Sequence, residues 1–133
     1  MNELKLFTLH EANGLIPRLS ELLARLHEKR DEISSMEVRI DALELITEHA
    51  HRAEELNDLT QAHQVLAAEF YHLVDEIHAC GCFLKDLDIG LVDFYGVVDG
   101  EVVYLCWRLG ETRVCHWHEV GKGFANRHPL NEG

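Results

Sequence analysis

The sequence lacks any apolar run close to the roughly 20 residues that a membrane-spanning helix requires. It also begins without the basic and apolar segments that make up a secretory signal peptide. Both absences argue against a membrane or secreted protein, so we expect a soluble cytoplasmic protein. In that compartment the four cysteines are expected to be reduced.

Basic residues are scarce, because 12 Lys and Arg stand against 24 Asp and Glu, which gives a formal net charge of −12. A nucleic-acid-binding domain needs a basic face to neutralise phosphates. The composition therefore argues against nucleic acid as a partner. Apolar residues make up 47% of the chain and charged residues 27%, which is typical of a globular protein. At 133 residues we expect a single domain over 1–133.

Several sequence motifs of known chemistry are also missing. The chain contains no P-loop, no dinucleotide-binding glycine pattern, no nucleophile elbow and no HExxH helix. The cysteines do not have the usual spacing of a four-cysteine zinc site, because Cys80 and Cys82 are separated by one residue. Any functional site must therefore be assembled by the fold.

The first 81 residues have the pattern of a long antiparallel helical hairpin. Thr8 and Glu11 match a capping box, and Pro17 predicts an early kink or restart of the first helix. Apolar residues then recur at coiled-coil spacing in two stretches, 15–43 and 56–80, and the polar stretch 47–58 is the predicted reversal. Gly81 is a natural left-handed helix end.

Two helices cover each other along one seam only, so their other apolar positions need the strands or another subunit. We therefore expect a homodimer. His63 falls on the seam of the second helix and is expected to be a hydrogen-bonded core histidine.

After Gly81 the pattern changes to β, and we expect an antiparallel meander of about three strands over 82–120 and a loop over 121–133. Asp99-Gly100 predicts a two-residue hairpin turn, which pairs Asp93 with Cys106. A three-residue turn over 110–112 pairs Cys106 with His116 and Tyr104 with His118. A two-residue turn would instead place both histidines on the apolar face. The predicted fold class is α+β.

This register gives the sheet two unlike faces. The apolar face, which we expect to pack on the helices, carries Val92, Phe94, Val103, Leu105, Trp107, Cys115 and Trp117. The polar face, which we expect to be open to solvent, carries Asp93, Tyr95, Tyr104, Cys106, Arg108, His116 and His118.

The polar face is the candidate functional site. Its two histidines are roughly 7 Å apart along one strand, so both imidazoles can reach one cation, with Asp93 or Cys106 as a third ligand. The alternative is an ordinary hydrogen-bonded surface or subunit-interface pair. Glu119 falls on the opposite face and is expected to make a supporting contact rather than to bind the cation.

The chain also resembles a known family. The segments `CFLKDLDIGLVDF`, `GEVVYLCWRLGE` and `WHEVGKGFANRHPL`, together with the opening `FTLHEANGLIPRL`, are similar to the prokaryotic family known as domain of unknown function 2203. The resemblance spans nearly the whole chain and implies no established activity. Mapped onto this chain, the family pattern covers Lys85, Asp86, Gly90, Asp93, Phe94, Cys106, Trp107, Gly110, Glu111, Trp117, His118, Glu119, Gly123, Phe124 and Arg127. His116 is not in that pattern, which favours His118 with Asp93 and Glu119 or Glu111.

Two functional hypotheses follow. The first is a divalent-metal or small-ligand site on the polar face, with zinc as the first metal to consider and, if the site is catalytic, a metal-activated water for hydrolysis. Its candidate metal ligands are Asp93, Cys106, His116 and His118, and its candidate supporting or ligand-binding residues are Tyr104, Arg108, Glu111, Glu119 and Arg127. The second is a non-enzymatic, dimeric helical module that binds a protein partner.

Overall fold

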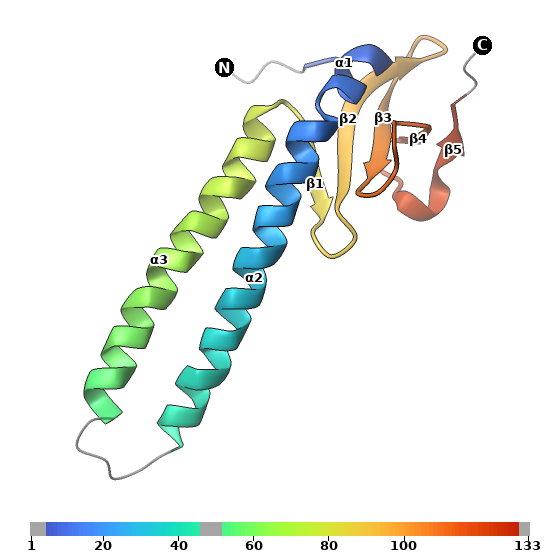
Figure 1. Ribbon diagram of the computed structural model, residues 1–133. Helices are drawn as coiled ribbons and strands as arrows, with labels where there is room; N and C mark the ends of the chain where they lie inside the picture. Colours follow the sequence, from blue (N-terminus) through green and yellow to red (C-terminus); the bar gives the residue numbers. More distant parts are fainter. Residues whose placement is uncertain (1–4, 46–51, 131–133) are drawn as a thin grey trace. The chain divides into compact units, whose positions relative to one another are not determined.

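The computed structural model describes residues 5–45 and 52–130 (Figure 1). Its helices are α1 (Leu9–Gly14), α2 (Ile16–Glu44), α3 (Arg52–Ala79) and the short 3₁₀ helix η1 (Phe124–Asn126). Its strands are β1 (Phe83–Asp86), β2 (Leu91–Val98), β3 (Glu101–Arg108), β4 (His116–Glu119) and β5 (His128–Pro129). The α+β class is confirmed. None of the described helices has the length and apolar character needed to cross a membrane.

The predicted helix boundaries at the N-terminus and at Gly81 are confirmed. The Thr8 hydroxyl accepts a hydrogen bond from the Glu11 amide at 3.1 Å, and the Glu11 carboxylate accepts one from the Thr8 amide at 2.9 Å. Helix α1 ends at Gly14 and α2 restarts at Ile16, with Pro17 in its first turn. Proline fits that position because first-turn amides have no partner within the helix. Gly81, with φ +94°, follows the end of α3.

The reversal between the long helices is shorter than expected. Helix α3 already begins at Arg52, six residues before the predicted turn at 47–58 ends. Residues 46–51, which hold the other part of that predicted turn, lie outside the described residues.

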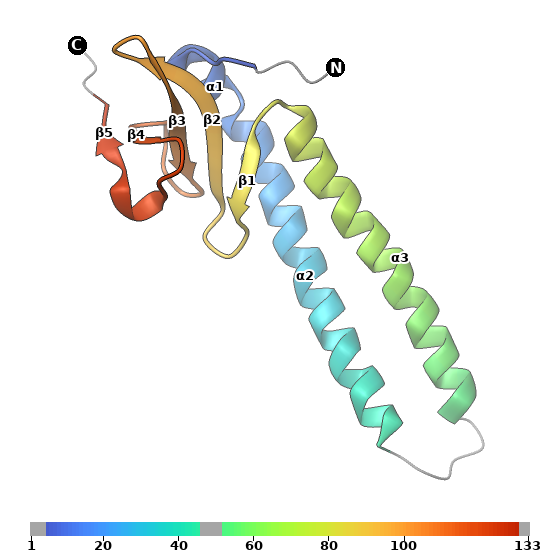
Figure 2. The same ribbon diagram turned by 180° about the vertical axis from the view of Figure 1, so that it is seen from behind.

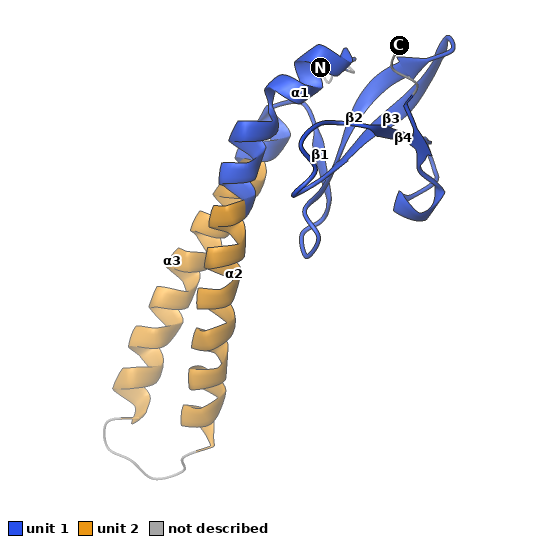
Figure 3. Ribbon diagram, turned by 45° about the vertical axis from the view of Figure 1, so that its right-hand side comes forward, with its two compact units in different colours: residues 1–23, 76–133 blue, residues 24–75 orange. Residues whose placement is uncertain are grey.

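The chain divides into two compact units (Figure 3). Unit 1 comprises residues 1–23 and 76–133 and contains the whole sheet, and unit 2 comprises residues 24–75 of the helical hairpin.

The sheet in unit 1 is an antiparallel meander in the order β1-β2-β3-β4-β5. Asp99 and Gly100 both have positive φ, 52° and 80°, as the predicted two-residue turn requires. Asp93 pairs with Cys106 and Cys106 pairs with His116. Both predicted registers are therefore confirmed.

The second hairpin differs from the expected three-residue turn, because β3 ends at Arg108 and β4 begins only at His116. Glu111 accounts for the early end of the ladder. Its carboxylate accepts a hydrogen bond from the Arg108 amide at 2.8 Å, and its carbonyl oxygen accepts one from the Trp107 indole at 2.9 Å. The Arg108 amide thus finds its partner in the loop rather than on β4.

The sheet has five strands in the described residues, not about three. Strand β1 pairs with β2, and its register shifts at Lys85. Strand β5 lies in the tail that was expected to be a loop and pairs with β4. Both strands are short and have little alternation of polar and apolar residues, so the sequence pattern did not predict them.

The core of unit 1 joins the apolar sheet face to helical residues of the same unit. Trp107, Phe94, Val92 and Ile77 are fully buried, and the Phe7 ring lies edge-on to Phe94 with centroids 5.1 Å apart. Part of the predicted core is wrong, because Trp117 and Cys115 are only half-buried. Trp117 packs instead on His128 of β5, with ring centroids 4.5 Å apart.

Unit 2 is a pair of helices lying side by side in both ribbon views (Figure 2). Lys29 and Glu69 form an ion pair across it at 3.2 Å. In 24–45 and 52–75, the described residues of this unit, only Leu26 and Leu73 are buried hydrophobic residues. The other seam residues are half-buried: Ile33, Met36, Ile40, Leu43, Leu56, Leu59, Leu66 and Phe70. The hairpin alone thus leaves its seam partly open.

Candidate metal centre

The polar face of the sheet is buried at its centre, contrary to the solvent-open face that we expected. Asp93 and His118 are each 1% exposed and Cys106 is 0% exposed. Asp93 lies on β2, Cys106 opposite it on β3, and His118 on β4 beside Tyr104. Three neighbouring strands therefore each place one potential metal ligand in the same buried region.

Aromatic rings cover one side of this region. Tyr95 stacks on Tyr104 with centroids 4.8 Å apart, and Phe83 of β1 lies edge-on to both rings. The Tyr104 ring lies 5.3 Å from the His118 ring, so it forms a wall of the site. The Lys85 ammonium sits 4.5 Å from the centre of the Tyr104 ring. Tyr104 is thus a packing neighbour of His118 and supplies no atom to its hydrogen bonds.

His118 is held by hydrogen bonds at both ring nitrogens. Nδ1 lies 3.0 Å from the Glu119 carbonyl oxygen, which only accepts, so Nδ1 carries a proton. Nε2 lies 3.0 Å from Oδ2 of Asp93. A second proton must lie in that bridge, on the nitrogen or on the oxygen, because two lone pairs would repel each other. The ring is therefore oriented with Nε2 facing the carboxyl group.

The other two members of the cluster are acids whose ionised forms are disfavoured by burial. Burial raises the pKa of Asp93, and the neighbouring His118 opposes that rise. Burial raises the pKa of the Cys106 thiol to about 12, and the charge of Asp93 adds to the rise. Oδ1 of Asp93 is buried and has no hydrogen-bond partner among the described residues. Without a cation, the site holds a protonated thiol and a carboxyl group with one unpartnered oxygen.

Asp93, Cys106 and His118 offer ligand atoms that all lie within 4.8 Å of one another. In the described part of the chain, no other group of three His, Cys, Asp or Glu residues meets this condition. A tetrahedral zinc ion with bonds of about 2.0–2.3 Å holds its ligands roughly 3.3–3.8 Å apart. The cluster therefore approaches the spacing that a metal centre needs.

His116 lies on the same face but has a different environment. Its Nδ1 accepts a hydrogen bond from Nη2 of Arg127, and Nδ1 lies 3.8 Å from Oε2 of Glu111. Nη2 of Arg127 also contacts the Glu111 carboxylate at 2.5 Å. The Nδ1 lone pair of His116 is thus used by Arg127, and the structure does not bring His116 into the three-residue cluster.

Two other predicted site residues lie at the edge. Glu119 contributes its carbonyl oxygen to His118, while its carboxylate contacts His128 at 3.1 Å. The Arg108 guanidinium lies over the Phe124 ring at 5.9 Å from its centre, and Arg127 approaches the same ring at 4.6 Å. Phe124 and the β1 residues Phe83 and Lys85 were not predicted as site residues from their chemistry.

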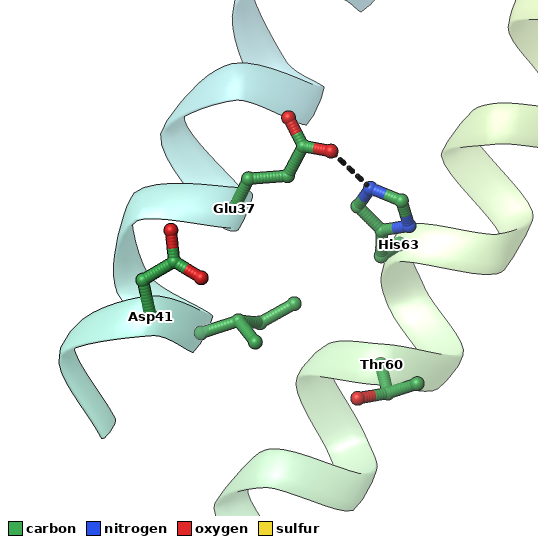
Figure 4. A pocket seen from close by; sticks show the side chains of 5 residues that line it. Glu37, Asp41, Thr60 and His63 are labelled. Atoms are coloured by element: carbon green, nitrogen blue, oxygen red, sulfur yellow. Dashed lines mark hydrogen bonds and ion pairs between the residues drawn. The ribbon is translucent and has the colours of Figure 1, made fainter. Parts of the chain in front are cut away.

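A second polar group lies in unit 2, around a pocket of about 400 Å³ (Figure 4). Glu37 and Asp41 of α2 and Thr60 and His63 of α3 line it, and Nε2 of His63 lies 3.2 Å from Glu37. His63 thus makes the expected hydrogen bond on the seam, but it is half-buried rather than a core residue. Glu37, Asp41 and Thr60 are exposed and His63 is half-buried, so the pocket lacks the desolvated character of the Asp93 cluster.

Comparison with protein families shows where the chain belongs. Residues 5–130 match the family described as an uncharacterized conserved protein, DUF2203. The chain belongs to this family. Searches of the curated proteins and of the solved structures returned no significant match. Membership in DUF2203 confirms the resemblance read from the sequence but brings no activity with it, so the function has to be argued from the site.

Proposed function

We propose that this DUF2203 protein binds a divalent metal ion, zinc in the first instance, through Asp93, Cys106 and His118. The observation that carries the proposal is the buried cluster itself, with ligand atoms from three strands within 4.8 Å of one another. A carboxylate, a thiolate and an imidazole form a donor set suited to zinc.

The orientation of His118 supports this proposal. Histidines that bind metals almost always donate their other ring N–H to a carbonyl or carboxylate, which fixes the ring. In this chain Nδ1 donates to the Glu119 carbonyl and Nε2 faces the cluster. The metal would replace the proton between Nε2 and Asp93.

Burial gives a second line of support. A buried carboxyl group with an unpartnered oxygen and a buried thiol are unfavourable unless something compensates their desolvation. A divalent cation bound by carboxylate and thiolate leaves the first coordination shell without net charge. A fourth position would remain for water or a ligand, as in catalytic zinc sites. Metal-assisted hydrolysis is the reaction class that such a site would suit.

The test is the metal content and zinc affinity of the protein prepared without a histidine tag. We expect one metal ion per chain, and we expect His118→Ala and Asp93→Asn to weaken zinc binding about a hundredfold or more. Asp93→Asn keeps the shape of the buried side chain, so the variant should fold. Weaker zinc binding by this variant would then reflect the lost carboxylate ligand rather than unfolding. His10→Ala, which removes an exposed histidine, is the matched control and should bind zinc normally. A wild-type protein that takes up no zinc overturns the proposal.

A second proposal concerns the helical hairpin: we propose that a second copy of the chain covers the seam of unit 2. The half-buried apolar residues follow coiled-coil spacing on both helices. In a two-fold dimer the same row of side chains would face its own copy, which makes the surface self-complementary. Such an interface would combine two hairpins into a four-helix bundle.

Sedimentation analysis tests this second proposal. We expect the wild-type protein to sediment as a dimer and Ile40→Asp, which places a charge on the seam, to sediment as a monomer. Val38→Asp places the same charge two residues away at a position that is 68% exposed, and it should remain a dimer. A monomeric wild type at high concentration contradicts the proposal.

A further inference from the structure

Arg127 has an unusual set of partners for a buried guanidinium. Its side chain is 12% exposed, and Nη2 serves both Glu111 and His116. Nη1 is buried and has no hydrogen-bond partner among the described residues. A guanidinium presents its donors in a rigid fork that matches the two oxygens of a carboxylate or a phosphate. Nη2 is thus held by Glu111 and His116, while Nη1 remains able to donate a hydrogen bond to a ligand.

Arg127 lies beside the candidate metal centre. It hydrogen-bonds to His116, which is the cross-strand neighbour of Cys106. Its positive charge acts on Cys106 and opposes the rise in the pKa of that thiol. Nη1 of Arg127 and Oδ1 of Asp93 are thus two buried, unpartnered polar atoms, on two residues whose charges both act on Cys106.

The charge around the cluster favours a negatively charged ligand. A divalent cation would balance Asp93 and a Cys106 thiolate, and Glu111 balances Arg127, which leaves the positive charge of Lys85 acting on the cluster. Lys85 acts on Asp93, and Arg108 lies with Arg127 at the Phe124 ring. Lys85 and Arg127 therefore place positive charge beside the cluster in a chain whose formal net charge is −12.

We infer that Arg127 is the anion-binding residue of this site, and that its ligand is a small oxyanion, either a carboxylate or a phosphoryl or sulfuryl group. One oxygen of the ligand takes the open position on the metal and another accepts a hydrogen bond from Nη1 of Arg127. The inference rests on the metal site proposed above. It adds a substrate class to that proposal, because a metal and an arginine together select two-oxygen ligands over anions with a single binding atom.

The experiment uses protein loaded with Co²⁺, whose visible spectrum changes when an anion binds to the metal. Acetate and sulfate are the oxyanion probes, and azide is the probe that binds metals without needing two oxygen contacts. We expect Arg127→Gln to weaken binding of at least one oxyanion by about tenfold or more and to leave azide affinity within about twofold of wild type. Arg25→Gln, which removes an exposed arginine of α2, is the matched control and should change neither.

Two further variants distinguish anion binding from a structural role of Arg127. Arg127→Lys keeps the charge but loses the fork, so it should bind oxyanions more weakly than wild type while retaining Co²⁺. Glu111→Gln removes the competing carboxylate and should raise oxyanion affinity. Equal oxyanion affinities of wild type and Arg127→Gln, or a spectrum that neither oxyanion changes, overturn the inference while the metal site stands. A wild type that fails to bind Co²⁺ overturns both proposals.

Discussion

Nε2 of His118 lies 3.0 Å from Oδ2 of Asp93, and both side chains are 2% exposed. This contact joins residues 25 positions apart in the sequence, on two strands that do not pair directly. Because Nδ1 of His118 must donate to a carbonyl oxygen, the contact holds one shared proton. Several measurable consequences follow from that proton and from the buried thiol beside it.

Metal binding should release protons. The bridge between Asp93 and His118 would give up one proton, and the Cys106 thiol, whose pKa is raised to about 12, would give up another. We expect the wild type to release about two protons per zinc ion near neutral pH and Cys106→Ser to release about one. Calorimetry in buffers of different ionisation enthalpy measures this number. Zinc affinity should also rise with pH, and an affinity independent of pH between 6 and 8 would contradict the assignment.

Burial of Asp93 should make the metal-free protein less stable as pH rises. A carboxyl group whose folded pKa is raised binds its proton more tightly in the folded state. Its stabilising effect is complete below the unfolded value, near pH 4, and is lost as pH rises through the folded value. Each pH unit within that window costs up to about 1.4 kcal/mol. In urea unfolding with a chelator present, Asp93→Asn should gain stability relative to wild type as pH rises from the unfolded to the folded pKa of Asp93. A stability difference between the two proteins that stays constant with pH would contradict this prediction.

Cys82 gives a related prediction outside the candidate site. Burial raises the pKa of its thiol to about 12, and the thiol donates to the Ile77 carbonyl oxygen at 3.4 Å. Because the folded pKa lies above the ordinary value of 9.0, stability attributable to the protonated thiol is lost as pH rises from 9 towards 12. At pH 8 we expect Cys82→Ala to be less stable than wild type by about 1 kcal/mol. The difference should shrink in alkaline solution, whereas a gap that widens there would show that the thiol ionises more readily in the folded state.

The lack of a side chain at Gly96 of β2 leaves room for the Leu105 side chain of β3. A Cβ atom added there would lie 2.6 Å from the Leu105 side chain, which is buried in the core. We expect Gly96→Ala to lower the free energy of unfolding by about 1–3 kcal/mol through overpacking. Gly14→Ala is the matched control, because a Cβ added in α1 meets nothing within 4 Å. It should be neutral or stabilising by up to about 1 kcal/mol. Equal effects of the two substitutions in thermal unfolding would refute this packing argument.

Much of the fold follows from short local signals in the sequence. The Asp99-Gly100 turn determines which residues of β2 and β3 pair, because only a few residue types adopt two consecutive positive φ angles. The capping box at Thr8 and the glycine at position 81 similarly mark helix ends by local hydrogen bonding and backbone conformation. From these signals the faces of the central strands, and hence the neighbours Asp93 and Cys106, could be predicted.

The environment of the site could not be predicted in the same way. Whether the polar face is open or buried depends on β1 and on the tail after β4, whose short strands lack a periodic pattern. The Phe83 ring packs on Tyr104, the Phe124 ring contacts Arg108 and Arg127, and Arg127 takes the Nδ1 lone pair of His116. These contacts join segments far apart in the sequence, so strand alternation could not predict them. Alternation alone made His116 and His118 equivalent, whereas in the structure His116 binds Arg127 and His118 binds Asp93.

The most direct test of the metal centre is X-ray absorption at the zinc edge of the fully loaded wild-type protein. The account predicts one sulfur ligand at about 2.3 Å and nitrogen or oxygen ligands at about 2.0–2.2 Å, with the sulfur lost in Cys106→Ser and retained in Cys115→Ser. A zinc ion bound by nitrogen and oxygen alone, or by two or more sulfurs, would contradict it.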